Sequence, residues 1–380
     1  MHSFLLAGNM NPRITDIVEI INRIAPFRLA EEWDNVGLQV GDPNATAAKI
    51  MVALDAGKEA IDAAVDSGCR LLVTHHPLML RPQKKIDLSE PSGALIGKAL
   101  QHSLNIVSLH TNFDIAPGGV NDLLAARLGL VSTTPLSVTS VDGLVKLAVF
   151  VPKGHEEKVM QALFQFSGFI GNYSECSFQV PGTGTFKPLA GAAPFLGSIG
   201  TREYAEETRI EVLLRAEDAA AARAALLAAH PYEEPAFDLY PLMNEGRREG
   251  LGRIGELPSA VSLECLVARL KGEFSLEGVR YVGEGSRSVR KIALCGGSGS
   301  SLLRDAHRQG ADVLVTGDVK YHEAREAQML GLCLIDLGHF ASEILMVDGF
   351  IARLEVELRV RGLTAELIAC KEERDPYRYR

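Results

Sequence analysis

The chain has 380 residues, of which 47% are hydrophobic and 23% are charged, and this length and composition are typical of a globular protein with two or three domains. Its formal net charge of −9 disfavours binding to nucleic acid by broad neutralisation of phosphates. The six cysteines are scattered and form no CxxC pair, which argues against a zinc ribbon and against a disulfide scaffold.

No apolar run approaches the roughly 20 residues that span a bilayer, so we expect no membrane partner. The first residues, MHSFLLAGNM, have neither the basic start nor the long apolar core of a signal peptide. We therefore expect a cytoplasmic protein. Met10 is an alternative to Met1 as the natural start, and residues 1–10 are then expected to be a disordered extension.

The first predicted element is a helix that begins near Ile14. Isoleucines recur through residues 14–24 at the spacing of one helix face, and Pro26 ends the pattern. Short runs of β-branched residues and leucine then alternate with helix-like segments of about ten residues. This alternation is typical of a mostly parallel sheet covered by helices.

The pattern changes near Asp142. Residues 142–244 begin with a predicted strand and helix, continue with strands and turns, and end with a strand–helix–strand unit. A polar, glycine-rich stretch, NEGRREGLGRIG, follows from Asn244. These patterns predict a separate α+β module that is inserted between residues 11–141 and residues 245–380.

The last third of the chain repeats the pattern of the first. A strand that opens at Lys49 is followed by one that ends at Thr74, and a strand that opens at Lys291 is followed, after the same interval, by one that ends at Thr316. We infer a duplication in which two α/β halves form one sheet and one domain, interrupted by the inserted module. Chance similarity between ordinary β-α-β units is the alternative.

Functional side chains of open α/β sheets collect where the strands end at their carboxyl edge. Histidines and carboxylates fill these positions in LLVTHH, SLHTNFD, VTGDVKYHE and LIDLGHFASE. The last of these segments places a histidine and a glutamate one turn apart on a predicted helix, so that they share one face. The candidate metal ligands are His75, His76, Asp114, His339 and Glu343.

Imidazole and carboxylate ligands together suit zinc, iron, manganese and nickel. Five such groups are enough for two divalent ions, and two-metal sites are suited to activating water for hydrolysis. In the doublet His75–His76, each ring at the end of a buried strand needs a partner or incurs a cost of about 1–3 kcal/mol. Because Pro77 favours an extended backbone at His76, we expect the two rings to diverge toward two ions.

Glu343 is the central candidate for a catalytic group. Asp318, His322 and His110 are weaker candidates, expected to orient ligands or to carry protons beside the metal ions. The alternative for His110 is a hydrogen-bonded histidine at the edge of the core. The alternative for His322 is a solvent-exposed position on an amphipathic helix.

The segment GGSGSS, residues 296–301, opens a predicted helix and is a candidate phosphate cradle. It lacks the P-loop and dinucleotide-binding signatures, so a plain tight turn is an equal alternative. No GxSxG motif follows a strand, and no cysteine lies at a strand end beside a histidine. Catalysis by a nucleophilic serine or cysteine is therefore disfavoured.

Taken in order, the motifs EEWDNVGLQVGD, LLVTHHPL, HTNFD with GGVND, VTGDVKYHE and GHFASE resemble the GTP cyclohydrolase 1 type 2 homologue family of dinuclear-metal proteins. The middle block, with GNYSECSFQVPGTGTFKP and AHPYEEPAFDLYPL, looks like the PII-like (ferredoxin-like) insert of the longer bacterial members. The resemblance covers nearly the whole chain after residue 10.

This resemblance implies a toroidal homohexamer with two divalent metal ions in each subunit. It implies that one ion is held by His76, Asp114 and Glu343. The other is then held by His75, His339 and Glu343, so that the carboxylate of Glu343 bridges the two ions. The family name implies hydrolytic opening of the guanine ring of GTP.

Two functions from different classes are consistent with these patterns. The first is a metal-dependent hydrolase that acts on a nucleotide or a similar small molecule. The second is a non-catalytic metal-binding or regulatory hexamer whose insert senses a small molecule. A ring that binds DNA or protein is a third hypothesis, and the net charge of −9 disfavours nucleic acid as the partner.

Overall fold

The computed structural model describes residues 10–378 and 380. The chain divides into two compact units: Ser140–Arg248, which we call the inserted unit, and a main unit made of the segments on either side of it. The expected extension at residues 1–10 lies outside the described residues except for Met10, which forms an isolated parallel bridge with Leu363. Within the described ranges, no helix is both long and apolar enough to cross a bilayer.

The first sheet of the main unit has five strands in the order β1-β4-β3-β2-β15. Strand β1 is antiparallel to β4, and the other neighbours are parallel. The strands are β1 (Gly37–Val40), β2 (Lys49–Ala53), β3 (Leu71–Thr74), β4 (Asn105–Ser108) and β15 (Glu366–Ala369). Helices connect the parallel strands as predicted, namely α2 (Lys58–Asp66) and α3 (Pro91–Gln101).

The second sheet of the main unit has six strands in the order β11-β14-β13-β12-β10-β5. Strands β12, β13 and β14 are parallel, whereas β10 is antiparallel to β12 and β11 is antiparallel to β14. The strands are β5 (Val131–Val141), β10 (Arg248–Ser262), β11 (Arg280–Val282), β12 (Ser288–Leu294), β13 (Val313–Thr316) and β14 (Cys333–Asp336). Its helices are α8 (Leu263–Glu273), α9 (Leu303–Arg308) and α10 (Tyr321–Leu330).

The two repeated β-α-β units have the same parallel pairing, β2 with β3 and β12 with β13, but they lie in two different sheets. The prediction that both halves form one sheet is therefore wrong. In the first sheet, β1 and β15 flank the parallel core on its two sides, and in the second sheet β10 and β11 do so. These flanking strands occupy the positions beside the repeated β-α-β units at which the two halves would have to pair, and the result is a mixed α/β fold with two sheets.

Helices α1 (Ile14–Ile24) and α12 (Leu345–Val360) pack together and contribute to one core with the first sheet. The isoleucines that predicted α1 are its buried residues. Phe350 of α12 meets Phe113 of α4 (Thr111–Ile115) edge to face, with ring centroids 5.8 Å apart. This core holds α4 in place, and α11 (His339–Glu343) leads directly into α12. Helix α5 (Val120–Arg127) packs against both α4 and α12.

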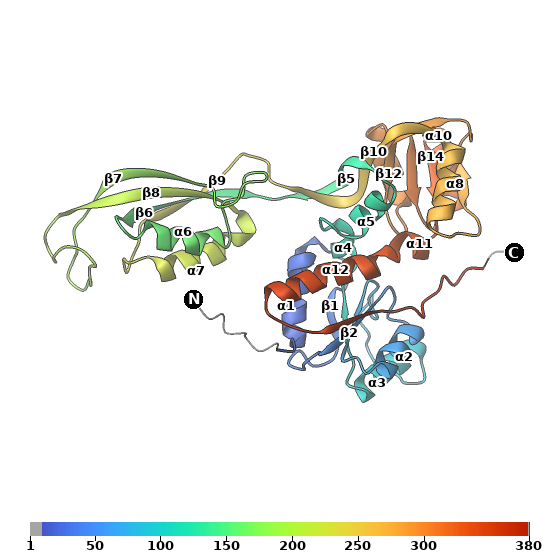
Figure 1. Cartoon of the computed structure of the whole chain (residues 1–380), viewed down its shortest axis with the longest axis horizontal. Coiled ribbons are helices and arrows are strands. Elements are labelled where there is room, and N and C mark those ends of the chain that lie inside the picture. Colours follow the sequence, from blue (N-terminus) through green and yellow to red (C-terminus); the bar gives the residue numbers. More distant parts are fainter. Residues whose placement is uncertain (1–9, 379) are drawn as a thin grey trace, which may run out of the picture. The chain divides into compact units, whose positions relative to one another are not determined.

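The inserted unit has a four-stranded antiparallel sheet in the order β7-β8-β6-β9, with two helices that pack on one face (Figure 1). Its elements are β6 (Leu144–Pro152), α6 (Glu156–Phe164), β7 (Ser177–Phe186), β8 (Glu203–Arg215), α7 (Ala219–Ala229) and β9 (Phe237–Pro241). This β-α-β-β-α-β order is that of ferredoxin-like modules. The more specific assignment as a PII-like insert stays a prediction.

Candidate metal centre

The five predicted metal ligands come together at the strand ends of the main unit. His75 and His76 directly follow β3, Asp114 lies in α4 after β4, and α11 after β14 carries the remaining two. The relative exposures of three of them are very low, 0% for His75, 8% for Asp114 and 4% for Glu343. Charged groups are rarely buried in this way unless they are paired or bind a metal ion.

Two groups of ligand atoms share the carboxylate of Glu343. In the first, which we call the His75 group, His75 Nε2 lies 3.6 Å from Asp114 Oδ1 and 3.8 Å from Glu343 Oε1. In the second, the His76 group, Glu343 Oε2 lies 3.1 Å from His76 Nε2 and 3.0 Å from His339 Nε2. The two imidazole nitrogens of the His76 group are 3.3 Å apart. Glu343 thus directs one oxygen toward each group.

The pairing of the histidines differs from the one that the family resemblance implied. His75 was expected with His339, and His76 with Asp114, whereas the structure places these partners the other way round. The reason is the anchoring of the rings. His75 is held by the carbonyl of Leu109, close to α4 and Asp114, whereas the ring of His76 lies 5.2 Å from that of His339. The position of Glu343 between the groups agrees with the expected bridge.

Each clustered histidine donates Nδ1–H to a protein oxygen. The acceptors are the Leu109 carbonyl at 3.0 Å for His75, Asp55 at 2.8 Å for His76, Asp34 at 2.8 Å for His110 and Asp318 at 2.7 Å for His339. Metal-binding histidines almost always have such a second partner, because it fixes the tautomer and the direction of the other nitrogen. Because Nδ1 is used in this way, Nε2 is the atom of each ring that would bind an ion, after loss of any proton that it carries.

Three buried atoms at the centre have no hydrogen-bond partner among the described residues: His75 Nε2, Asp114 Oδ1 and Glu343 Oε2. An unsatisfied buried polar atom costs about 1–3 kcal/mol. A cation in the His75 group would satisfy His75 Nε2 and Asp114 Oδ1, and a cation in the His76 group would satisfy Glu343 Oε2. Ligands about 2.0–2.1 Å from a tetrahedral ion lie about 3.3 Å apart, close to the spacing in the His76 group. The residues present therefore fit a metal site.

The pKa values at the centre follow from burial and from the neighbouring charges. Burial lowers the pKa of His75 to about 4, so its ring is neutral. Burial has the same direction at His76, but the carboxylates of Asp55 and Glu343 outweigh it and raise the pKa to about 10. Glu343 also raises the pKa of His339 to about 9.

The two buried carboxyl groups shift in opposite directions. Burial and then the charge of Glu343 raise the pKa of Asp114 well above its usual range. Burial acts to raise the pKa of Glu343 as well, but the surrounding histidines, His75 first, outweigh it and hold this pKa well below its usual range. Protons therefore balance the charge of the metal-free cluster at neutral pH, and a metal ion would replace them.

The structure brings two of the three weaker candidates to the cluster. His110 offers a ring nitrogen near those of His75 and His76, and its ring centroid lies 5.2 Å and 5.5 Å from theirs. Asp318 holds His339, and its positive φ of 55° turns the loop after β13 toward that ring. His322 is exposed in the first turn of α10, where its ring contacts Tyr321. The structure therefore places His322 apart from the ligands.

Three residues beside the ligands were not assigned a role from the sequence. Asp34 binds His110 and Thr111, and these contacts outweigh burial and lower its pKa to about 2. Glu373 accepts the backbone N–H groups of Leu54 and Asp55, and so holds the loop that carries Asp55. Of these three residues, only Asp55 could have been found from the sequence, because it follows β2 and other strand ends carry the proposed ligands. Asp34 and Glu373 lie at no strand end.

The GGSGSS segment is part of the metal centre's wall, and side chains accept three of its backbone N–H groups. The backbone N–H of Gly296 donates to Asn121, that of Gly297 to Ser342, and that of Gly299 to Thr316. Since protein side chains already use these donors, the tight-turn alternative is the one that the structure supports. Gly297 packs directly against the carboxylate of Glu343.

A buried cluster of histidines and carboxylates at the strand ends defines the chain as an α/β protein with a candidate metal centre. The family model described as Duf34/NIF3 (NGG1p interacting factor 3) matches residues 12–376. The chain belongs to this family, and the resemblance predicted from the sequence motifs is confirmed.

Close relatives share nearly the full length of the chain. A protein of Halalkalibacterium halodurans named GTP cyclohydrolase 1 type 2 homolog is 41% identical over 364 residues, which cover 96% of this chain and 98% of the relative. A Bacillus subtilis protein of the same name is 39% identical over 364 residues, with coverages of 96% and 97%. The crystal structure of a Bacillus cereus protein related to NIF3 is similar with a TM-score of 0.90 and 38% identity, covering 97% of this chain and 99% of that one.

Proposed function

We propose that the chain is a metal-dependent hydrolase that binds two divalent ions per subunit, with zinc, iron, manganese and nickel as the candidate metals. The observation that carries the proposal is the place of Glu343. Its two oxygens face two separate groups of ligands, and the buried atoms of those groups lack other partners. The proposed ligands are His75, His76, Asp114, His339 and Glu343.

Divalent ions in such a site would supply Lewis acidity and lower the pKa of water, which makes hydroxide available near neutral pH. The chain's own residues would orient and protect the reaction. Asp55 and Asp318 hold the rings of His76 and His339 in one tautomer. His110, held by Asp34, is placed to take up or release a proton at Nε2 beside the cluster.

We propose the class of substrate from the name that the relatives carry. Those proteins are named GTP cyclohydrolase 1 type 2 homologs, so we propose a nucleotide-like substrate with GTP as the first candidate. A homohexameric ring in the cytoplasm, with no nucleic-acid or membrane partner, completes the proposal. The alternative function is a non-catalytic metal-binding or regulatory assembly, and a cavity in the inserted unit favours a ligand-sensing role for that unit.

The test is metal analysis of the purified protein, followed by a hydrolase screen over GTP, other nucleotides and phosphoesters. Wild type should contain two ions per chain and hydrolyse a member of the screen. Glu343→Gln should remain folded, lose both ions and reduce turnover to background. The matched control is Glu355→Gln on α12, because Glu355 is exposed and paired with Arg359.

Turnover of GTP that survives Glu343→Gln would show that the two-metal hydrolase is the wrong proposal for that substrate. Bound metal without turnover of any compound would favour the regulatory alternative. Loss of activity in Glu355→Gln as well would show that the loss in Glu343→Gln is not specific to the metal centre.

A further inference from the structure

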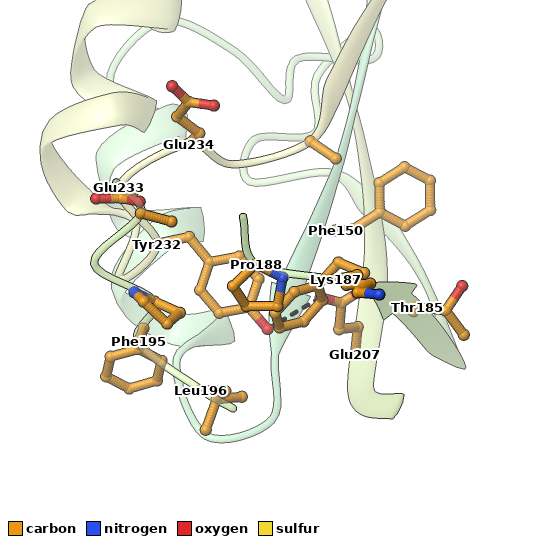
Figure 2. Close-up of a pocket in the computed structure, with 15 residues that line it drawn as sticks. Phe150, Thr185, Lys187, Pro188, Phe195, Leu196, Glu207, Tyr232, Glu233 and Glu234 are labelled. Atoms are coloured by element: carbon orange, nitrogen blue, oxygen red, sulfur yellow. Dashed lines mark hydrogen bonds between the residues drawn. The ribbon is translucent and has the colours of Figure 1, made fainter. Parts of the chain in front are cut away.

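We propose that the inserted unit contains a binding site for a small organic cation, an amine that carries an apolar or aromatic group. The site is a cavity of about 370 Å³ in the inserted unit (Figure 2). This volume is in the range of pockets that bind small molecules. The inference does not depend on the metal centre or on its activity, because none of the proposed metal ligands lines the cavity.

Aromatic rings form the apolar wall of the cavity. The ring centroid of Tyr232 lies 6.0 Å from that of Phe186 and 6.0 Å from that of Phe195, in tilted geometry. Phe150 lines the cavity as well. Phe195 is half-exposed, although burial of its ring would be favourable. Aromatic faces attract cations, and such walls recognise ammonium groups in proteins.

Carboxylates give the cavity its charge. Glu207, Glu233 and Glu234 line it, and Lys187 is the cation in the lining, so the lining carries a net negative charge at neutral pH. Tyr232 donates its hydroxyl hydrogen to Glu207 at 3.0 Å, which fixes this carboxylate next to the aromatic rings. A side chain at position 184 would collide with the Glu207 carboxylate, so the glycine at this position leaves room for that carboxylate.

A long connection closes one side of the cavity. Residues 187–202 join β7 to β8 without a helix or a strand, and they supply Lys187, Pro188, Phe195 and Leu196 to the lining. Ordered loops of this length are uncommon and are often functional. The backbone N–H of Ala193 donates to Glu233 at 3.0 Å, so this connection is tied to a carboxylate of the opposite wall.

The combination of groups selects one class of ligand. An anion such as a phosphate would face three carboxylates and one lysine, which disfavours it. A purely apolar ligand would have to desolvate the carboxylates without pairing them. An amine with an apolar or aromatic group satisfies both walls, because its charge pairs with Glu207 and its apolar part contacts the rings.

The experiment compares three probes of similar shape on the full chain: phenethylamine, 2-phenylethanol and phenylacetate. Affinity is measured by titration calorimetry, and contact with the protein by ligand-observed NMR. We expect phenethylamine to bind at least about tenfold more tightly than the neutral alcohol, and phenylacetate to bind most weakly. Glu207→Gln keeps the shape of the side chain and should weaken the binding of phenethylamine at least about tenfold.

Glu206→Gln is the matched control, because Glu206 is adjacent in sequence, exposed and paired with Lys153. Phe195→Ala is a second variant, which should also weaken binding and does not alter the charge. The proposal is overturned if none of the probes binds, if the alcohol binds as well as the amine, or if Glu206→Gln and Glu207→Gln bind phenethylamine equally.

Discussion

At the scale of single residues, each histidine of the doublet after β3 contributes to a different group of proposed ligands. His75 is fully buried and is held by a backbone carbonyl, whereas His76 is held by Asp55 at the end of the neighbouring strand. The two rings are tilted by 54° relative to each other. Both lie near His110, but only His75 is grouped with Asp114 and only His76 is grouped with His339. Adjacent residues can serve two sites because the strand has ended at Thr74.

Double substitutions test the grouping of the ligands. His75→Ala with Asp114→Asn removes two ligands from one group, so we predict a loss of one ion per chain. His75→Ala with His339→Ala removes one ligand from each group, so we predict a loss of both ions. The measurement is metal content by mass spectrometry after dialysis, with His307→Ala on the exposed face of α9 as the control. Equal loss in the two double variants would contradict the grouping.

The strand-end rule selected the five proposed ligands and His110, and the structure brings these six residues together. Their pairing was not predictable, because it depends on which oxygen holds the second nitrogen of each imidazole. Asp34 is one such group, and it lies in an irregular segment far from His110 in sequence. His322 is a histidine that follows a strand end, as the proposed ligands do, but it lies in the first turn of α10 and is exposed to solvent. The roles assigned to these residues in catalysis stay predictions.

At the scale of elements, the turn after β12 supports the metal centre. Gly297 has a positive φ of 59°, and a Cβ there would collide with Glu343 and press against His339. We predict that Gly297→Ala lowers metal content in both groups and destabilises the fold by more than the roughly 1–2 kcal/mol of backbone strain. The control is Gly331→Ala, which has a φ of 67° and open space around the added Cβ.

Metal content and unfolding by denaturant are measured for both variants. Gly331→Ala should lower the stability only by the backbone strain and should leave the metal content unchanged. Equal metal content in Gly297→Ala and Gly331→Ala would show that the turn does not position Glu343.

His230, in the turn after α7, is expected to make the free energy of unfolding of the inserted unit depend on pH. His230 donates from Nε2 to the Phe150 carbonyl at 3.0 Å and accepts the backbone N–H of Tyr232 at Nδ1. Burial lowers the pKa of His230 below its ordinary value of 6.5. As the pH falls below about 6.5, the unfolded chain takes up a proton before the folded chain does, so His230 lowers the free energy of unfolding.

This effect should be absent in His230→Gln, which does not titrate. The measurement is the free energy of unfolding of both proteins between neutral and mildly acidic pH. A decrease of the same size in both proteins would contradict the role of His230.

The helix from Ile14 and the alternating strands and helices were predictable because their patterns are local. The division into two sheets was not predictable, because it depends on which strands pair at the edges of each sheet. β15 comes from the end of the chain and pairs with β2, near its beginning. No periodicity within either segment records that pairing.

At the scale of the whole molecule, the proposed metal ligands all lie outside the inserted unit. The N–H of Asp142 donates to the carbonyl of Arg247 at 2.9 Å, so the chain comes close together at the two ends of residues 142–244 and a short turn can join residues 141 and 245. We predict that deletion of residues 142–244 leaves two ions per chain and abolishes the binding of phenethylamine. Loss of metal from a folded, soluble deletion variant would contradict the independence of the metal centre.

The central claim is a pair of metal ions on either side of Glu343. Its most direct test is anomalous diffraction from crystals of the metal-loaded protein, recorded at the absorption edge of the bound metal. We predict two peaks per chain, one among His75, Asp114 and Glu343 and the other among His76, His339 and Glu343. A single peak, or peaks elsewhere in the chain, would contradict the claim.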